Sequence, residues 1–324
     1  MTEEERNGGC GVLTVGSLAL DNVETPLGKV EDALGGAAVY SAVAASFFAP
    51  AMMVCVAGED FPERHFSFLK ERQIDISGIQ IVPGKSFRWW GSYDYDLNQA
   101  RTLRTELNVF NDFHPVIPES YKDAPYVFLA NIDPDLQLEV LAQLRAPKLV
   151  VCDTMNFWIE KKRDRVVEVL RKSDVAFMND AEAREFCGTS SVVKAAELIR
   201  SYGPDVAVIK KGEHGALMFT DHTHFAAPAY PLAEVKDPTG AGDSFAGGFI
   251  GYLAHTDELT ERNLRKAVVY GSALASFNVE DFSLERLRRL THREISDRYE
   301  EFKRISFFEE VEIFDSGQIY IRRG

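Results

Sequence analysis

The chain has 324 residues, 45% of them hydrophobic, which fits one large α/β domain with a sizeable core. Its 36 basic and 50 acidic residues give a net charge of −14. This charge argues against nucleic-acid or anionic-membrane partners, because both need basic faces. The four cysteines have no metal-ligand spacing, and no apolar run is long enough to span a membrane. Residues 1–9 have the composition of a flexible polar tail, without a signal-peptide pattern, so we expect a cytoplasmic protein with reduced thiols.

Short apolar segments alternate with helical patterns along most of the chain. Strands are predicted at residues 12–16, 51–57, 126–129, 148–152, 175–178 and 206–209. Helices are predicted at residues 35–48, 66–72, 136–144, 163–172 and 192–202. The alternation predicts an α/β fold with a doubly wound, mostly parallel sheet and helices on both faces. In such sheets ligands bind at the carboxyl ends of the strands.

One segment breaks this alternation, because residues 87–95 and 102–110 both have strand patterns and flank a polar turn at 96–99. Apolar side chains recur at period two, at Phe87, Trp89, Tyr93 and Tyr95 in the first strand and at Leu103, Leu107 and Val109 in the second. The pattern predicts a hairpin with one apolar face. An isolated hairpin is only marginally stable, so this apolar face must pack against another surface. In the simplest case that surface belongs to the parent domain.

The composition changes after Asp281. Residues 284–302 predict one charged helix with leucines at helical spacing, and residues 311–314 and 318–321 predict short strands. We expect residues 283–324 to form an extension that packs on a domain of residues 10–282 and has no chemical role.

The most informative segment is Asp-Pro-Thr-Gly-Ala-Gly-Asp at residues 237–243, which leads into an apolar helix. Gly240, Ala241 and Gly242 allow backbone N–H groups to approach a ligand without obstruction. These donors lie at a helix N-terminus, where they are unpaired and the dipole end is positive, so the segment predicts an anion site. Asp243 would repel an anion there, unless it takes a proton from a group that attacks the anion.

This segment resembles the C-terminal signature of the ribokinase-like (PfkB) family of carbohydrate and nucleoside kinases. The resemblance implies that Gly240, Ala241 and Gly242 form the anion hole for a transferred phosphoryl group. It implies that Asp243 is the general base for the acceptor hydroxyl. It also implies a ribokinase-like fold, ATP and Mg²⁺ as cofactors, and a small β-sheet lid formed by about residues 18–34 and 86–112. Such lids often form a dimer interface, so a homodimer through the lid is one expected assembly.

The resemblance extends to residues that would bind the acceptor. Gly35 and Gly36 match a turn that approaches the sugar, and Asp21 matches an aspartate that accepts hydrogen bonds from substrate hydroxyls. One carboxylate can accept both donors of a vicinal diol, although a solvated turn would also explain Asp21. Tyr40 stands where relatives carry a sugar-binding asparagine, so the chain departs from the pattern at the acceptor. Two further acceptor contacts are expected at Arg88 and Asn131.

The phosphate side has matches of its own. Asn179 and Glu182 match an element that organises Mg²⁺ and phosphate, although the same letters fit an ordinary helix capping box. Lys210 stands where relatives have threonine or serine near the ATP phosphates, and it could instead be a solvated turn lysine. The remaining nucleotide-binding candidates are Asn156, Gly212, Gly215 and Gly271.

Together these patterns predict an ATP-dependent kinase that phosphorylates a hydroxymethyl group of a sugar or nucleoside. The aromatic residues Phe87, Trp89, Tyr93 and Tyr40 could stack a nucleobase. A sugar acid would instead need a cation on the lid, such as Arg88 or Arg104. A non-catalytic ligand sensor is a third hypothesis, and the intact anion hole and Asp243 argue against it.

Overall fold

The computed structural model describes residues 11–308. Its main sheet has nine strands in the order β13-β12-β11-β10-β9-β8-β1-β4-β5. These are β1 (Val12–Val15), β4 (Ala51–Gly58), β5 (Asp75–Val82), β8 (Tyr126–Leu129), β9 (Leu149–Cys152), β10 (Val175–Asn179), β11 (Val206–Lys210), β12 (Ala216–Phe219) and β13 (His224–Ala227). All neighbours are parallel from β5 to β11, whereas β12 and β13 are antiparallel. The predicted doubly wound, mostly parallel sheet is therefore confirmed.

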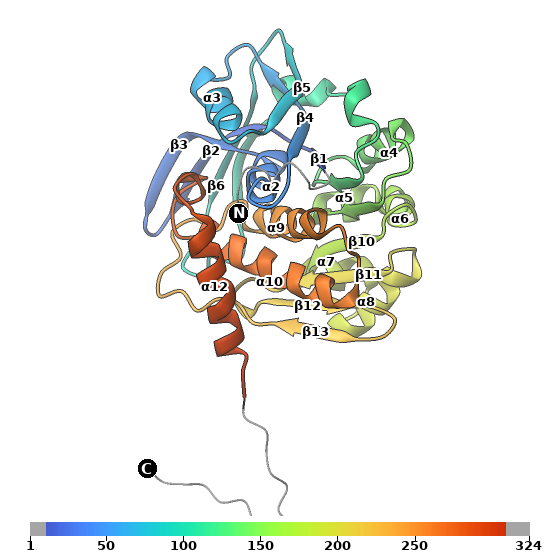
Figure 1. Cartoon of the computed structure of the whole chain (residues 1–324). Helices are drawn as coiled ribbons and strands as arrows, with labels where there is room; N and C mark the ends of the chain where they lie inside the picture. Colours follow the sequence, from blue (N-terminus) through green and yellow to red (C-terminus); the bar gives the residue numbers. More distant parts are fainter. Residues whose placement is uncertain (1–10, 309–324) are drawn as a thin grey trace, which may run out of the picture.

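Helices cover both faces of this sheet (Figure 1). One face carries α2 (Ala37–Ala45), α3 (Glu63–Glu71), α9 (Ala241–Thr256), α10 (Glu261–Asn278), α11 (Glu285–Arg288) and α12 (His292–Ile305). The other face carries α4 (Pro134–Gln143), α5 (Asn156–Lys161), α6 (Arg163–Leu170), α7 (Asp180–Cys187) and α8 (Val192–Ser201). Alternate strand residues enter the two hydrophobic cores, because successive side chains point to opposite faces. Val12 belongs to the first core and Leu13 to the second.

A second sheet of four strands lies apart from the main sheet, in the order β3-β2-β6-β7. Its strands are β2 (Ala19–Thr25), β3 (Gly28–Gly35), β6 (Phe87–Ser92) and β7 (Arg101–Glu106). We call this sheet the lid, and it comes from the two segments expected to form one. The second predicted strand is too long, because residues 108–112 form a 3-10 helix. The apolar residues predicted to be covered there are not all covered: Leu103 is 55% and Leu107 is 43% exposed.

The C-terminal region differs from the predicted single helix. The chain leaves the helical path after α11, and Thr291 starts α12 with a capping box to Glu294. The predicted leucine stripe of Leu284, Leu287 and Leu290 is buried in the first core. The expected tail at residues 1–9 and the strands at 311–314 and 318–321 lie outside the described residues. No helix within residues 11–308 is long and apolar enough to cross a membrane.

The packing of α2 on α9 depends on residues without side chains. At Gly247 of α9 an added Cβ would lie only 2.1 Å from the Ser41 carbonyl oxygen of α2. At Gly248 the nearest heavy atom, the Tyr270 carbonyl oxygen of α10, would be 3.0 Å away. The helix that follows residues 237–243 is thus held by close backbone contact on two sides.

Gly247→Ala tests this packing. Helix propensity alone would make the variant more stable by about 1 kcal/mol. We expect the steric overlap to outweigh propensity and to lower the free energy of unfolding by about 1–3 kcal/mol, measured by urea denaturation. Gly248→Ala is the matched control and should lose less. A Gly247→Ala variant more stable than the wild-type protein would contradict the packing account.

Candidate active site

The predicted anion site is an uncapped helix N-terminus. Gly240 precedes α9 in the left-handed region with φ 75°, and no side chain caps the helix. A Cβ at Gly240 would lie 2.4 Å from the ring of Tyr40, so only glycine fits between this turn and α2. The Ala241 N–H donates to the Pro238 carbonyl at 3.2 Å, but the next N–H group, that of Gly242, is left for a ligand, and the dipole adds positive potential.

The loop that leads into this turn is fixed by Asp237, which is fully buried. Its Oδ1 accepts a hydrogen bond from the Thr239 N–H at 2.9 Å, and its Oδ2 accepts one from the Ser283 N–H at 3.0 Å. Asn278 adds a third tie, because its Nδ2 donates to the Thr239 carbonyl at 2.7 Å. Sequence reasoning missed Asn278 and Ser283, because nothing near either residue in the chain indicates a contact with residues 237–239.

Asp243 lies on the first turn of α9 beside a buried ion pair. Lys210 Nζ is 2.5 Å from Asp153 Oδ2, and a Cβ at Gly242 would lie 3.2 Å from the same Nζ. Burial raises the pKa of Asp243 to about 7, with Asp153 contributing and Lys210 opposing. Burial by itself would lower the pKa of Lys210, but the carboxylates of Asp153 and Glu182 outweigh it, so this lysine keeps its charge. A carboxylate that titrates near neutral pH is suited to accept a proton.

Asp21 faces the same site from the lid. It is 5% exposed, and burial raises its pKa to about 8, with Asp237 and Asp243 as further causes. A Cβ at Gly35 would lie 1.9 Å from the Asp21 carboxylate, so the absence of a side chain there makes room for it. Gly36 follows with φ 98° and starts α2. The structure thus brings Asp21, Gly35 and Gly36 together with the turn before α9.

The lid carries aromatic residues on this inner face. Trp89 of β6 is the register partner of Asp21 in β2, so the two side chains share a face of the lid. The Trp89 ring lies along its own strand, because a Cβ at Gly91 would be 2.0 Å from it, and its Nε1 donates to Thr102 Oγ1 at 3.2 Å. Four residues after Trp89, the Tyr93 hydroxyl accepts a hydrogen bond from Thr239 Oγ1 at 3.2 Å.

The far end of the lid reaches the loop between β11 and β12. Asn98, in the turn between β6 and β7, donates from Nδ2 to Glu213 Oε1 at 3.4 Å. A Cβ at Gly212, which has φ 53°, would lie 2.4 Å from Asn98 Oδ1. Gly215 has φ 83° in the same loop. The lid therefore spans from Asp21 to the loop that contains two of the expected nucleotide-binding glycines.

Other predicted site residues have different surroundings. Arg88 is the register partner of Leu20 on the opposite face of the lid, and it pairs with Asp32 and with Asp60, so the structure does not bring it to Asp21. Gly271 is buried in α10, where a Cβ would lie 2.7 Å from the Phe245 carbonyl oxygen, and helix packing accounts for it.

Three further candidates vary in exposure. Tyr40 is 1% exposed, and its ring packs under Gly240. Asn156 is an exposed residue at the start of α5. The Asn131 side-chain oxygen is buried without a hydrogen-bond partner among the described residues, which leaves an acceptor for a ligand. The roles of these residues stay predictions.

The expected Mg²⁺ residues form the capping box that the sequence also allowed. The Glu182 N–H donates to Asn179 Oδ1 at 2.8 Å, and the Asn179 N–H donates to Glu182 Oε2 at 2.7 Å. No cluster of three metal-binding acidic, histidine or cysteine residues occurs within residues 11–308. Mg²⁺ usually keeps several waters and needs only one or two carboxylates, so Glu182 with its second oxygen fits such a site. Burial and the charge of Asp153 raise the Glu182 pKa to about 7.

One open hollow lies away from these residues. It has a volume of about 440 Å³ and is lined by residues of α10, α12 and β13, with none of the predicted site residues among them. The site described above is instead a convergence of backbone turns and charged side chains at the carboxyl ends of the strands and under the lid.

Comparisons with known proteins agree with this geometry. Residues 13–286 match the model of the pfkB family of carbohydrate kinases. Over 245 residues the chain is 33% identical to the cytidine kinase of Thermococcus kodakarensis, an alignment that covers 74% of this chain and 87% of that protein.

Two crystal structures share the fold. The nucleoside kinase of Methanocaldococcus jannaschii, an archaeal member of the ribokinase family, superposes with a TM-score of 0.72 at 22% identity, covering 91% of this chain and 100% of that one. The aminoimidazole riboside kinase of Salmonella enterica superposes with a TM-score of 0.71 at 18% identity, covering 89% and 99%. The predicted family and fold are thus confirmed, and the chain belongs to the pfkB family of carbohydrate and nucleoside kinases.

Proposed function

We propose that the protein is an ATP-dependent nucleoside kinase that phosphorylates the hydroxymethyl group of a ribonucleoside. The observation that carries this proposal is the position of Asp243, a carboxylate with a pKa raised to about 7 beside the uncapped N-terminus of α9. An acid in that position serves no purpose for anion binding alone. It is well placed to remove a proton from a hydroxyl that attacks a phosphoryl group at the helix end.

The proposed step moves one proton and one phosphoryl group. The acceptor hydroxyl gives its proton to Asp243 while its oxygen forms a bond to the γ-phosphorus of ATP. The bond between that phosphorus and the bridging oxygen breaks, and ADP leaves with the electron pair. The N–H groups of Gly240 and Gly242 stabilise the negative charge on the transferred group, because they are preorganised and partly shielded from water, whereas the Ala241 N–H holds the turn through the Pro238 carbonyl.

Cations near this point assist the transfer. Lys210 Nζ is held by Asp153 close to Gly242, where it faces the same anion. Glu182, with Asn179, would hold a hydrated Mg²⁺ that arrives with ATP and neutralises phosphate charge. Three carboxylates, those of Asp153, Glu182 and Asp243, lie near one lysine in this part of the site. A Mg²⁺ ion bound to ATP would offset their negative charge.

The lid favours a nucleoside over a sugar acid. Asp21 can accept hydrogen bonds from two neighbouring ribose hydroxyls, and Trp89 provides a flat aromatic surface on the same face. The cations that a sugar acid would need are engaged elsewhere: Arg88 pairs with Asp32 and Asp60, and Arg104 pairs with Glu106 and lies over Trp90. The identity to a cytidine kinase supports the same acceptor class.

The function is tested by ATP consumption with cytidine, uridine, adenosine, ribose, fructose and gluconate as acceptors. We expect turnover with at least one nucleoside, and Asp243→Asn should reduce it by roughly 10²–10⁴-fold, the usual contribution of a positioned base. Turnover restricted to a sugar or sugar acid would contradict the acceptor assignment. Near-normal turnover in Asp243→Asn would contradict the role of Asp243 as general base. A wild-type protein that binds these ligands without turning them over would be a ligand sensor.

The pH dependence gives a second test of a carboxylate base beside Asp153. A base works only when deprotonated, so we expect kcat/KM to fall as the pH drops through about 7, the pKa of Asp243. Asp153→Asn removes a negative charge that raises this pKa. The acid limb of the profile should therefore move to lower pH. Asp174→Asn makes the same change at the other end of the strands and should leave the acid limb where it is in the wild-type protein. A shift of the acid limb to higher pH in Asp153→Asn would refute the assignment of the base.

Trp89→Leu tests the stacking surface. Stacking of a base on an aromatic side chain contributes about 1–3 kcal/mol, so we expect KM for a nucleoside to rise about five-fold or more. KM for ATP should stay unchanged. Trp90→Leu is the matched control, because Trp90 points to the opposite face of β6 and lies under Arg104. Equal effects of the two variants would show that Trp89 does not contact the acceptor.

A further inference from the structure

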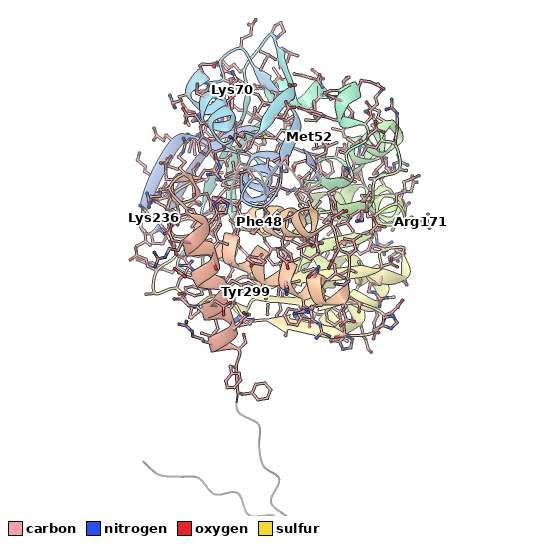
Figure 2. All side chains as sticks on the ribbon, viewed as in Figure 1. Phe48, Met52, Lys70, Arg171, Lys236 and Tyr299 are labelled. Carbon is pink, nitrogen blue, oxygen red and sulfur yellow. The ribbon has the colours of Figure 1, made fainter. Side chains whose placement is uncertain are left out.

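The segment after α10 lies between the lid and the loop before Gly240. Lys236 in that loop donates from its N–H to the Val279 carbonyl at 2.8 Å, and its Nζ is 2.7 Å from Asp281 Oδ1. The Lys236 carbonyl in turn accepts a hydrogen bond from Thr25 Oγ1 of β2 at 2.9 Å. Figure 2 labels Lys236 at the side of the molecule where β3 lies. One loop residue is therefore tied both to the lid and to residues 279–281.

Ser283 makes the second connection. Its N–H donates to Asp237 Oδ2 at 3.0 Å, and its hydroxyl donates to the Leu34 carbonyl of β3 at 2.6 Å. It is 5% exposed and has φ 51°, a conformation that a residue with a side chain seldom adopts. A single residue thus joins Asp237 to the strand end that leads directly into Gly35.

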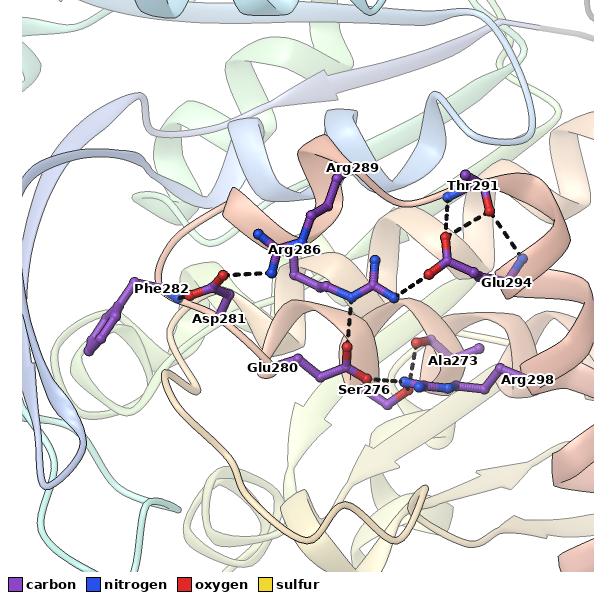
Figure 3. Close-up of polar contacts among 10 residues, drawn as sticks. All are labelled: Ala273, Ser276, Glu280, Asp281, Phe282, Arg286, Arg289, Thr291, Glu294 and Arg298. Carbon is purple, nitrogen blue, oxygen red and sulfur yellow. Dashed lines mark hydrogen bonds and ion pairs between the residues drawn. The ribbon is translucent and has the colours of Figure 1, made fainter.

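The helices that follow hold this segment in place. Glu280 accepts from Arg286 Nε at 2.7 Å and pairs with Arg298 Nη1 at 2.7 Å, so one carboxylate connects α11 to α12 (Figure 3). The Arg298 guanidinium lies 3.6 Å from the ring centroid of Phe277 and 4.1 Å from that of Tyr230. Asp281 is paired on its other side with Arg289 at 2.7 Å. Partly buried pairs of this kind are screened little by solvent, so they restrict movement of residues 280–283.

Ser283 joins the Leu34 carbonyl, on the side that would bind the acceptor, to the Asp237 carboxylate, on the side of the catalytic loop. Leu34 leads to Gly35, beside which Asp21 would hold the acceptor, whereas Asp237 fixes the turn that leads to Asp243. The acceptor hydroxyl must meet Asp243 within hydrogen-bond distance, and a misplacement of about 1 Å can cost 100-fold in rate. We propose that Ser283 is a positioning residue that aligns the acceptor side of the lid with the catalytic loop, an inference that rests on the proposed kinase function.

The test compares Ser283→Ala and Ser283→Gly with the wild-type protein. Both variants remove the hydroxyl that reaches Leu34 and keep the N–H that reaches Asp237, while glycine also relieves the left-handed backbone. We expect kcat/KM for the acceptor to fall about three- to tenfold in both, through a lower kcat, because one lost hydrogen bond loosens the alignment with Asp243, with KM for ATP within about twofold of wild type. Thr25→Val, which removes the other bond from the lid, should show the same pattern.

Ser276→Ala is the matched control. Its hydroxyl is also buried and bonds Ala273 and Arg298 in the same region, but it touches neither the lid nor residues 236–240 (Figure 3). We expect it to leave kcat/KM for the acceptor and KM for ATP unchanged. An unchanged kcat/KM for the acceptor in folded Ser283→Ala and Ser283→Gly would overturn the proposal, as would a rise of the same size in KM for ATP.

A second readout separates this proposal from the proposed function. Amide hydrogen exchange of β2 and β3 needs no substrate, and we expect faster exchange of residues 28–35 in Ser283→Ala than in Ser276→Ala. If the wild-type protein transfers phosphate to none of the acceptors, the kinase proposal fails, while exchange still reports whether Ser283 restrains the lid. Unchanged exchange in an active Ser283→Ala protein would refute the restraint alone.

Discussion

The backbone N–H groups of Gly240 and Gly242, which have no capping side chain at the start of α9, are the feature on which the rest of this structure depends. They can remain unpaired only because Gly240 turns the chain in the left-handed region and the Tyr40 ring fills the space below. The positive end of the helix allows carboxylates to gather nearby, and burial then raises their pKa values toward neutrality. The small residues of α2 and α9 fix this end of the helix through close backbone contact. The proposed catalytic chemistry and the packing of α9 thus depend on the same small residues.

Charge in the site is divided between two regions. Asp153, Glu182 and Asp243 surround Lys210 on the side of the strand ends, whereas Asp21 and Asp237 lie under the lid. The two regions influence each other, since Asp243 contributes to the raised pKa of Asp21. In the proposed function, a ligand with hydroxyl donors occupies the second region and a phosphate with its cation occupies the first. This division suits a kinase, which transfers a phosphoryl group from one small substrate to another.

Much of the site could be predicted because its residues follow strands. Parallel strands end at one edge of the sheet, so Asn179 and Lys210, the last residues of β10 and β11, had to lie near each other. The glycines within residues 237–243 also predict the turn that precedes α9. The environment of Arg88 could not be predicted, because its face depends on pairing with β2, a strand without an alternating apolar pattern. Ser283 was equally hidden, since its partners Leu34 and Asp237 are remote in sequence.

Some patterns admitted two outcomes that only three dimensions separate. Asn179 and Glu182 match both a helix capping box and a phosphate-binding element in sequence. Their hydrogen bonds show the capping box. The leucines at 284, 287 and 290 have helical spacing, yet the chain needs a break before α12 to return along α10. The β12–β13 pair escaped prediction although β8 and β9 are equally short, because β13 lies at the sheet edge with His224 and Ala226 exposed and has no continuous buried run.

The burial of the C-terminal helices bears on where this domain ends. The match to the family model ends at residue 286, inside α11. The first hydrophobic core nevertheless includes Leu287, Leu290 and Ile295, and Phe302 is only 2% exposed. A shortened chain that follows the similarity boundary would expose this apolar surface and lose Arg298 from its place between two rings. The folding unit therefore extends beyond the segment that matches the family model, and expression boundaries should be drawn beyond α12.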